Sequence, residues 1–210
     1  MQDVTQYEVL VMGIGNILWA DEGFGVRAVE RYHEKFADDC RVRVIDGGTL
    51  GAYLINEVIN ARRLLIFDCC DLKAAPGTMR LLRGDEIKIW SATKISPHQT
   101  GMNDVLATAM LQGYEPEKLT VIGVQPKELE DYGGSLTETV KAAIEPAVDC
   151  AAKELADWGF APELRTPGSE VSTLGDETLE MSTYESERPD EEAACRTGDS
   201  RFFRRSGSCV

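Results

Sequence analysis

The chain has 210 residues, 43% of them hydrophobic, which is enough for one folded domain with a core of its own. Its formal net charge of -14 argues against the basic surface that binds a phosphate backbone, so we expect no nucleic-acid partner. No apolar run approaches the roughly 20 residues that span a bilayer, and the six cysteines lack paired spacing, so we expect a soluble cytoplasmic protein with reduced thiols and no membrane partner.

The beginning of the chain has the pattern of a strand, a turn and a helix. Residues 9–12 form a continuous apolar run, which the glycine turn at 13–16 closes. Such a run predicts a strand that is buried on both faces, as in a parallel sheet. After Asp21, a candidate N-cap, apolar side chains recur at helical spacing from Glu22 to about Phe36.

Two further strands are expected to end at aspartates. Apolar side chains between Val42 and Asp46 predict the second strand, and residues 50–58 carry the spacing of a second helix. The apolar run at 64–67 predicts a third strand, which Asp68 follows directly. Both aspartates are therefore expected at the edge of the sheet where its strands end.

The middle of the chain predicts a mixed sheet. Residues 78–82 follow the third strand too closely for a helical crossover, which predicts an antiparallel strand. Residues 96–98 are expected to form a loop that carries His98 just before a helix at about 103–112. The apolar run at 119–124 predicts another buried strand.

The last third of the chain divides into a helix and a tail. Ser135 and Glu138 have the spacing of a capping box that opens a long helix, in which Pro146 predicts a kink or a break. Apolar periodicity ends at about Glu163, so we expect one domain at 1–162 and a disordered tail at 163–210. Deleting that tail is expected to leave core stability nearly unchanged.

Four metal-competent side chains follow strands or turns at the expected carboxyl edge of the sheet. They are Glu22, Asp46, Asp68 and His98. Ligands of open α/β folds bind at this edge, because loops from different segments meet there. Carboxylates combined with an imidazole favour a borderline ion such as nickel or zinc over calcium or magnesium. The pattern therefore indicates a site that recognises a metal ion.

Each of these residues also has an ordinary structural explanation. Glu22 lies at a helix start, where the helix dipole favours acids, and Asp46 heads a glycine pair and could initiate a turn. Asp68 follows four apolar residues, which favours the mouth of the sheet over a solvated face. His33 fits a helical boundary position, whereas no apolar periodicity accounts for His98.

Other enzyme and binding classes fit the sequence less well. The turn Gly13-x-Gly15-x-x-Leu18 lacks the third glycine of a dinucleotide fingerprint, so its glycines are interpreted as geometric. No G-x-S-x-G elbow or H-E-x-x-H helix is present, and no motif marks a cysteine as a nucleophile. A standard serine, cysteine or zincin hydrolase is therefore not expected.

Taken together, the motifs of residues 9–159 resemble the nickel-iron hydrogenase maturation endopeptidases. The motifs that carry the resemblance are Gly13-Ile14-Gly15-Asn16, Asp21-Glu22-Gly23-Phe24-Gly25-Val26-Arg27, Asp46-Gly47-Gly48-Thr49, the strand ending at Asp68, Ala75-Pro76-Gly77-Thr78, and Lys94-Ile95-Ser96-Pro97-His98-Gln99. The resemblance implies an α/β three-layer sandwich with a mixed, mostly parallel five-stranded sheet. It also implies cleavage of a C-terminal extension from the precursor of the hydrogenase large subunit, by a protein that we expect to be monomeric when free.

The resemblance also assigns residues to this reaction. It implies that Glu22, Asp68 and His98 bind nickel, which the substrate carries, so that only a loaded precursor is recognised. Asp46 is implicated in recognition or cleavage. The cleavage step stays open: a metal could polarise the scissile carbonyl or activate water, with Asp46 or Asp68 as catalytic base.

Two alternatives to the endopeptidase have distinct consequences. A non-catalytic nickel-sensing assembly factor for the large subunit would use the same three ligands but release no peptide. A nucleotide-binding module built on the glycine turn would be stabilised by an adenine nucleotide, which the acidic charge and the incomplete fingerprint disfavour.

Overall fold

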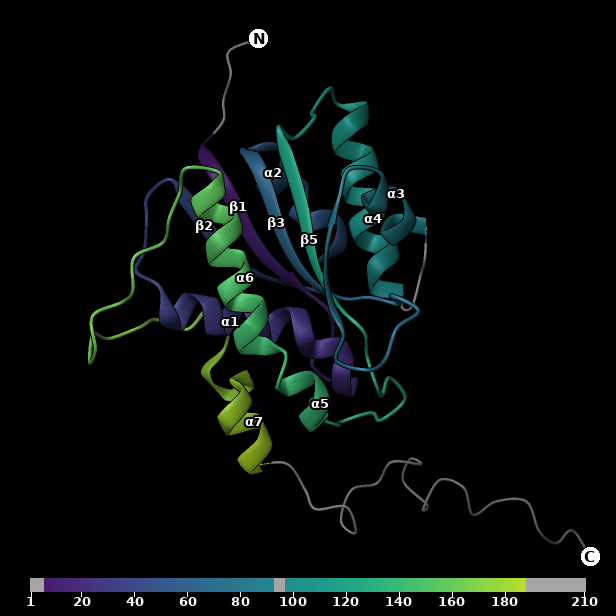
Figure 1. Ribbon diagram of the computed structural model, residues 1–210, viewed down its shortest axis with the longest axis vertical. Helices are drawn as coiled ribbons and strands as arrows, with labels where there is room; N and C mark the ends of the chain where they lie inside the picture. Colours follow the sequence, from purple (N-terminus) through teal and green to yellow (C-terminus); the bar gives the residue numbers. More distant parts are fainter. Residues whose placement is uncertain (1–5, 93–96, 188–210) are drawn as a thin grey trace, which may run out of the picture.

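The computed structural model describes residues 6–92 and 97–187, which form a sheet between two layers of helices (Figure 1). The strands are β1 (Tyr7–Ile14), β2 (Val42–Gly48), β3 (Ala61–Cys69), β4 (Met79–Arg83) and β5 (Lys118–Val124). The helices are η1 (Ala20–Gly23), α1 (Phe24–Lys35), η2 (Gly51–Leu54), α2 (Ile55–Ile59), α3 (Asp85–Ala92), α4 (Pro97–Leu111), α5 (Glu138–Lys141), α6 (Ile144–Asp157), η3 (Glu177–Leu179) and α7 (Met181–Glu187).

The sheet has the order β2-β1-β3-β5-β4. Strands β2, β1, β3 and β5 are parallel, and β4 pairs antiparallel with β5 at one edge. The predicted mixed, mostly parallel five-stranded sheet is thus confirmed. The antiparallel partner of β4 is β5, however, and not the strand that precedes it in the chain.

The two faces of the sheet are buried by different helices. Val11 and Phe67 belong to the core that α1 and α6 cover, whereas Met12 and Ile66 belong to the core under α2, α3 and α4. Neighbouring residues of one strand point to opposite faces, so both sets must be apolar, and the strands read as continuous apolar runs. No helix within the described residues combines the length and apolar composition needed to cross a bilayer.

The glycines of the first motifs allow β1 and α1 to lie unusually close together. A Cβ at Gly13 would overlap the Gly25 carbonyl, and one at Gly25 would overlap the carbonyl oxygens of Ile14 and Phe67. Gly15 has a φ of 139°, and a Cβ there would overlap the Glu22 carbonyl oxygen. The structure therefore supports a geometric role for these glycines.

Two predicted helix starts are wrong. Helix α4 begins at Pro97, so His98 lies in its first turn and not in a loop before it. Proline is favoured in a first turn because its missing N–H has no intrahelical partner there. The last helical segment starts with Thr137 as N-cap, and Pro146 falls in the first turn of α6, after a break between α5 and α6.

The expected disordered tail is contradicted for residues 163–187, because this segment lies against α1 and α5. Leu174 and Met181 pack on the core that α1 and α6 cover. Arg27 donates a 2.6 Å hydrogen bond to the Leu179 carbonyl, and Lys141 forms a 2.8 Å ion pair with Glu185. We call residues 163–187 the C-terminal strap. Residues 188–210, the rest of the predicted tail, lie outside the described residues.

Removing the C-terminal strap is expected to destabilise the protein, contrary to the expectation from sequence. A chain ending at residue 162 should lose about 2–4 kcal/mol of unfolding free energy, because apolar contacts and hydrogen bonds to α1 are lost. Urea denaturation measures the difference. A chain ending at residue 187 is the control, since it keeps every contact described above. Equal midpoints for both truncations would contradict the prediction.

Candidate active site

The parallel strands bring three of the four predicted site residues to one edge of the sheet. Asp46 lies near the end of β2 and Asp68 near the end of β3, while Glu22 lies in η1, between β1 and α1. The backbone of His98 lies in the first turn of α4, and its side chain is not among the described ones. The elements that carry Glu22, Asp46 and Asp68 therefore reach the same edge of the sheet, whereas their convergence on one site stays a prediction.

Glu22 has a buried carboxylate oxygen at this edge that no described residue satisfies. Its residue is 8% exposed, and Oε1 is buried without a hydrogen-bond partner among the described residues. Ala20, two residues earlier, is buried with a φ of 42°, a conformation that costs non-glycine residues about 1–3 kcal/mol. The fold thus maintains a strained turn that holds a desolvated carboxylate, which is the arrangement expected of a ligand.

Asp68 is buried and oriented by an indole. Trp90 in α3 donates a 2.7 Å hydrogen bond from Nε1 to Asp68 Oδ2, and the Cys70 thiol lies 3.5 Å from the same oxygen. Asp68 is only 3% exposed. Trp90 was not predicted as a site residue, because no local sequence signal connects it to a strand end 22 residues earlier.

The adjacent cysteines do not have the environment of nucleophiles. Burial, together with the charge of Asp68, raises the pKa of both Cys69 and Cys70 well above the ordinary thiol range. A nucleophilic cysteine needs a lowered pKa, so the exclusion of cysteine hydrolase chemistry is supported. The Glu22 charge also raises the pKa of Cys69, so Glu22 and Asp68 both act on this thiol and lie near it.

Asp46 and Asp68 point to opposite faces of the sheet. Gly13 pairs with Asp46 on one side and with Phe67 on the other, so Asp46 shares the face of Phe67, on which α1 packs. Asp68, one residue later in β3, points to the other face and toward α3. The two predicted catalytic aspartates are therefore separated by the sheet.

The Asp46 carboxyl lies in a partly buried environment beneath the C-terminal strap. Its Oδ1 is buried without a hydrogen-bond partner among the described residues, and a Cβ added at Gly175 would lie 3.6 Å from Oδ2. Burial raises the pKa of Asp46, and the Gly48 amide and the Arg27 cation oppose that shift in part. A raised carboxyl pKa suits a general base that works near neutral pH.

Asp46→Asn is expected to stabilise the fold at neutral pH while it lowers activity. Because burial raises the folded-state pKa of Asp46, the contribution of this residue to stability is most favourable below the ordinary aspartate pKa and is lost as pH rises through the folded-state value. Asparagine carries no charge, so its advantage should appear at pH 7 and shrink at about pH 3.5. Thermal melts at the two pH values measure it, and a variant less stable than wild type at pH 7 would contradict the prediction.

Asp21 is a structural centre of this edge that the sequence presented only as a candidate N-cap. It is fully buried and accepts hydrogen bonds from the amides of Lys127 (2.8 Å), Glu128 (2.9 Å) and Thr137 (2.7 Å). It thereby joins η1 to the segment between β5 and α5. The residue next to it in the chain is Glu22, so this network fixes the position of the candidate ligand.

The described side chains alone do not complete a metal site. Among the described side chains, which do not include that of His98, no three His, Cys, Asp or Glu side chains form a group that could hold a metal ion. Oε1 of Glu22 is buried without a hydrogen-bond partner among the described residues, which nevertheless suits a carboxylate that coordinates a cation. The set of Glu22, Asp68 and His98 stays a prediction.

Comparison with known proteins identifies similar sequences and structures. Residues 26–154 match a family model described as hydrogenase maturation protease. Hydrogenase expression/formation protein HupD of Rhodobacter capsulatus is 50% identical, over 93% of this chain and 92% of the relative. Hydrogenase 2 maturation protease of Escherichia coli is 43% identical, over 72% of this chain and 92% of the relative.

Solved structures show the same fold. The hydrogenase maturating endopeptidase HybD of Escherichia coli superposes with a TM-score of 0.70 at 42% identity, covering 75% of this chain and 97% of its own. A match over 93% of 210 residues, as with HupD, must include the C-terminal strap, whereas the solved structure leaves a quarter of this chain uncovered. The match to HupD therefore covers more of this chain than the HybD structure does.

Proposed function

Because the chain belongs to the hydrogenase maturation protease family and is an endopeptidase, we propose that it removes a C-terminal extension from the nickel-loaded precursor of the nickel-iron hydrogenase large subunit. The nickel belongs to the substrate in this proposal. Glu22, Asp68 and His98 would complete its coordination shell, so that an empty precursor is not bound productively. A carboxylate pair with an imidazole suits nickel.

The observation that carries this proposal is the state of the Glu22 carboxylate. Oε1 is removed from water and has no hydrogen-bond partner among the described residues. An uncompensated buried carboxylate oxygen is costly, so its presence at this edge favours a partner that binds later. A cation on the bound substrate is such a partner, and Asp68, held by Trp90, would supply a second oxygen.

Opposite orientations of the two aspartates support different roles for them. Asp68 would act as a ligand, oriented by the Trp90 indole. Asp46, with its raised pKa, would act as the base that takes a proton from water as water attacks the scissile carbonyl. The proton would then pass to the leaving amine, which completes hydrolysis of the peptide bond.

Incubation with precursor, with and without nickel loaded, followed by intact-mass measurement, tests the proposal. We expect the mass of the large subunit to fall by that of one C-terminal peptide only when nickel is present. Nickel-dependent binding without a change in mass would favour the alternative of a non-catalytic nickel-sensing assembly factor. If the protein neither binds nor cleaves the nickel-loaded precursor, the proposed substrate is wrong.

We further propose that the protein acts in the cytoplasm as a monomer until it meets the precursor. The four described cysteines, Cys40, Cys69, Cys70 and Cys150, are free thiols, which is typical of a reducing compartment. Sedimentation of the free protein and of its mixture with precursor tests the monomeric state.

A further inference from the structure

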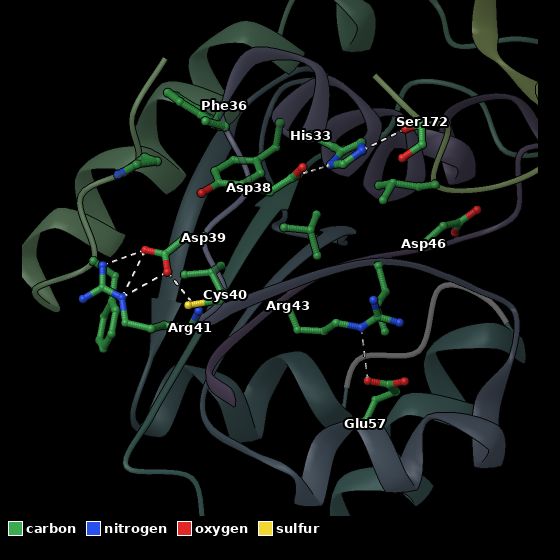
Figure 2. Close-up of a pocket in the computed structure, with 18 of the residues that line it drawn as sticks. His33, Phe36, Asp38, Asp39, Cys40, Arg41, Arg43, Asp46, Glu57 and Ser172 are labelled. Carbon is green, nitrogen blue, oxygen red and sulfur yellow. Dashed lines mark hydrogen bonds and ion pairs between the residues drawn. The ribbon is translucent and has the colours of Figure 1, made fainter. Parts of the chain in front are cut away.

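A groove of about 920 Å³ follows the outer edge of β2. Figure 2 shows Arg41 and Asp46 at opposite ends of this stretch of β2, with Arg43 and Glu57 on one side and His33 and Ser172 on the other. We call this hollow the β2 groove. The carboxylate proposed as the base therefore lies at one end of it.

The backbone of β2 offers unpaired hydrogen-bonding groups to the β2 groove. Arg41 accepts bonds from β1 through its carbonyl oxygen, and alternate residues of a parallel strand turn to the same neighbour. Val44 and Asp46 therefore direct their N–H and C=O groups to the open side, where no strand of the described residues lies beside β2. An exposed strand edge of this kind is a template for an added strand.

The rim of the groove carries apolar side chains that the fold leaves exposed. Tyr53 is 86% exposed and Leu50 is 51% exposed, and both line the β2 groove. Tyr53 lies in η2 and Leu50 directly precedes it. Helix α4 contacts η2 near its start, because a Cβ added at Gly101 would lie 3.3 Å from the Gly51 Cα. The groove therefore leads from Arg41 toward the segment that carries His98.

Charges in the β2 groove favour a cationic occupant. Asp39 pairs with Arg41 at 2.6 Å, and Glu57 pairs with Arg43 at 3.7 Å. Asp46 and Glu163 also line the groove, and neither forms an ion pair with a described side chain. A peptide with basic side chains would complement these two carboxylates.

The wall opposite η2 comes in part from the C-terminal strap. Ser172, Thr173 and Leu174 line the β2 groove, and His33 Nε2 lies 2.9 Å from the Ser172 carbonyl oxygen. Relatives that match 93% of the chain include this segment in their alignments, whereas the solved structure of the Escherichia coli endopeptidase covers 75%. The groove is thus formed jointly by the common fold and the strap.

We propose that the β2 groove binds part of the precursor's C-terminal extension as an extended, cationic strand added to β2, with the scissile bond near Asp46. The proposal rests on the proposed function. Five residues from Val42 to Asp46 span about 13 Å at strand spacing, so four or five substrate residues would lie along this edge. The Val42 N–H already donates to the Asp39 carbonyl oxygen, so the added strand would pair with the groups of Val44 and Asp46. Tyr53 and Leu50 would contact alternate side chains of the added strand.

A proline scan of the extension in the nickel-loaded precursor tests the added strand. Proline lacks the N–H that would bond to β2, so kcat/KM should fall about 10-fold or more at alternate positions and much less between them. Equal tolerance at all scanned positions would overturn the proposal. If the unsubstituted precursor is not cleaved at all, the proposed function has failed, and not the groove.

Variants of the rim provide the second test. Tyr53→Ala and Leu50→Ala should each raise KM about 5- to 10-fold with little change in kcat, because they remove contacts made before the chemical step. The control is Leu111→Ala, a leucine with 89% exposure that does not line the β2 groove. Unchanged KM in both rim variants, or an equal rise in the control, would contradict binding at this edge.

Discussion

Glu22→Gln is expected to abolish nickel-dependent cleavage while the fold remains intact. Glutamine keeps the shape of the side chain but removes the negative charge, so the substrate's nickel loses a proposed ligand. The loss of kcat/KM should exceed about 100-fold, more than is typical for residues that only support a metal ligand. Intact-mass analysis of nickel-loaded precursor measures it, with the melting temperature as a check on folding.

The environment of Glu22 also predicts how Glu22→Gln changes the melting temperature. Oε1 of Glu22 is buried and lacks a hydrogen-bond partner among the described residues, so the neutral variant should melt at or above the wild-type temperature. His98→Ala should also abolish cleavage, and Glu177→Gln, an exposed position in η3, is the control. Retained cleavage by Glu22→Gln would remove Glu22 from the site.

The strands could be predicted because their pattern is a direct consequence of burial on both faces. The runs at 9–12 and 64–67 lie within β1 and β3, and each is completely buried. The position of Asp68 followed from the same reasoning, since a polar residue after such a run must lie at the end of the buried strand. The location of Asp68 at the carboxyl edge of the sheet could therefore be predicted from sequence.

Features that depend on distant contacts were missed or wrong. The strap has few apolar residues, so its composition suggested disorder, yet the Arg27 guanidinium and the Lys141 amine hold it through partners 152 and 44 residues away. The cap at Thr137 displaced the predicted Ser135, whose hydroxyl instead donates to Glu185 of the strap. These pairings are set by tertiary structure, which local patterns do not encode.

The orientation of the two aspartates shows the same limit within the site. Both follow strands, so the sequence places both at one edge, but their faces depend on the register of β2, β1 and β3. A shift of one residue in β2 would have turned Asp46 to the face of Asp68. The division of roles between ligand and base therefore became visible only with the paired sheet.

Asp21→Ala is expected to cause the largest loss of stability of any single change discussed. The substitution leaves the buried amides of Lys127, Glu128 and Thr137 without their acceptor. Unsatisfied buried donors cost about 1–3 kcal/mol each, so a total loss of about 3–5 kcal/mol is expected. Urea denaturation measures it, with Asp104→Asn, an exposed aspartate of α4, as control.

Asparagine is not expected to rescue this position, which separates the proposed network from a simple packing effect. Oδ2 of Asp21 accepts from the Lys127 and Glu128 amides, and Oδ1 accepts from the Thr137 amide, so either orientation of an Asn side chain places its NH₂ against a backbone N–H. Asp21→Asn should therefore lose nearly as much stability as Asp21→Ala. Wild-type stability in Asp21→Asn would show that the amides find other acceptors. A loss in both variants would also explain why the strained turn at Ala20 persists, because Asp21 is the residue that ties η1 to the rest of the fold and fixes Glu22 beside the end of β3.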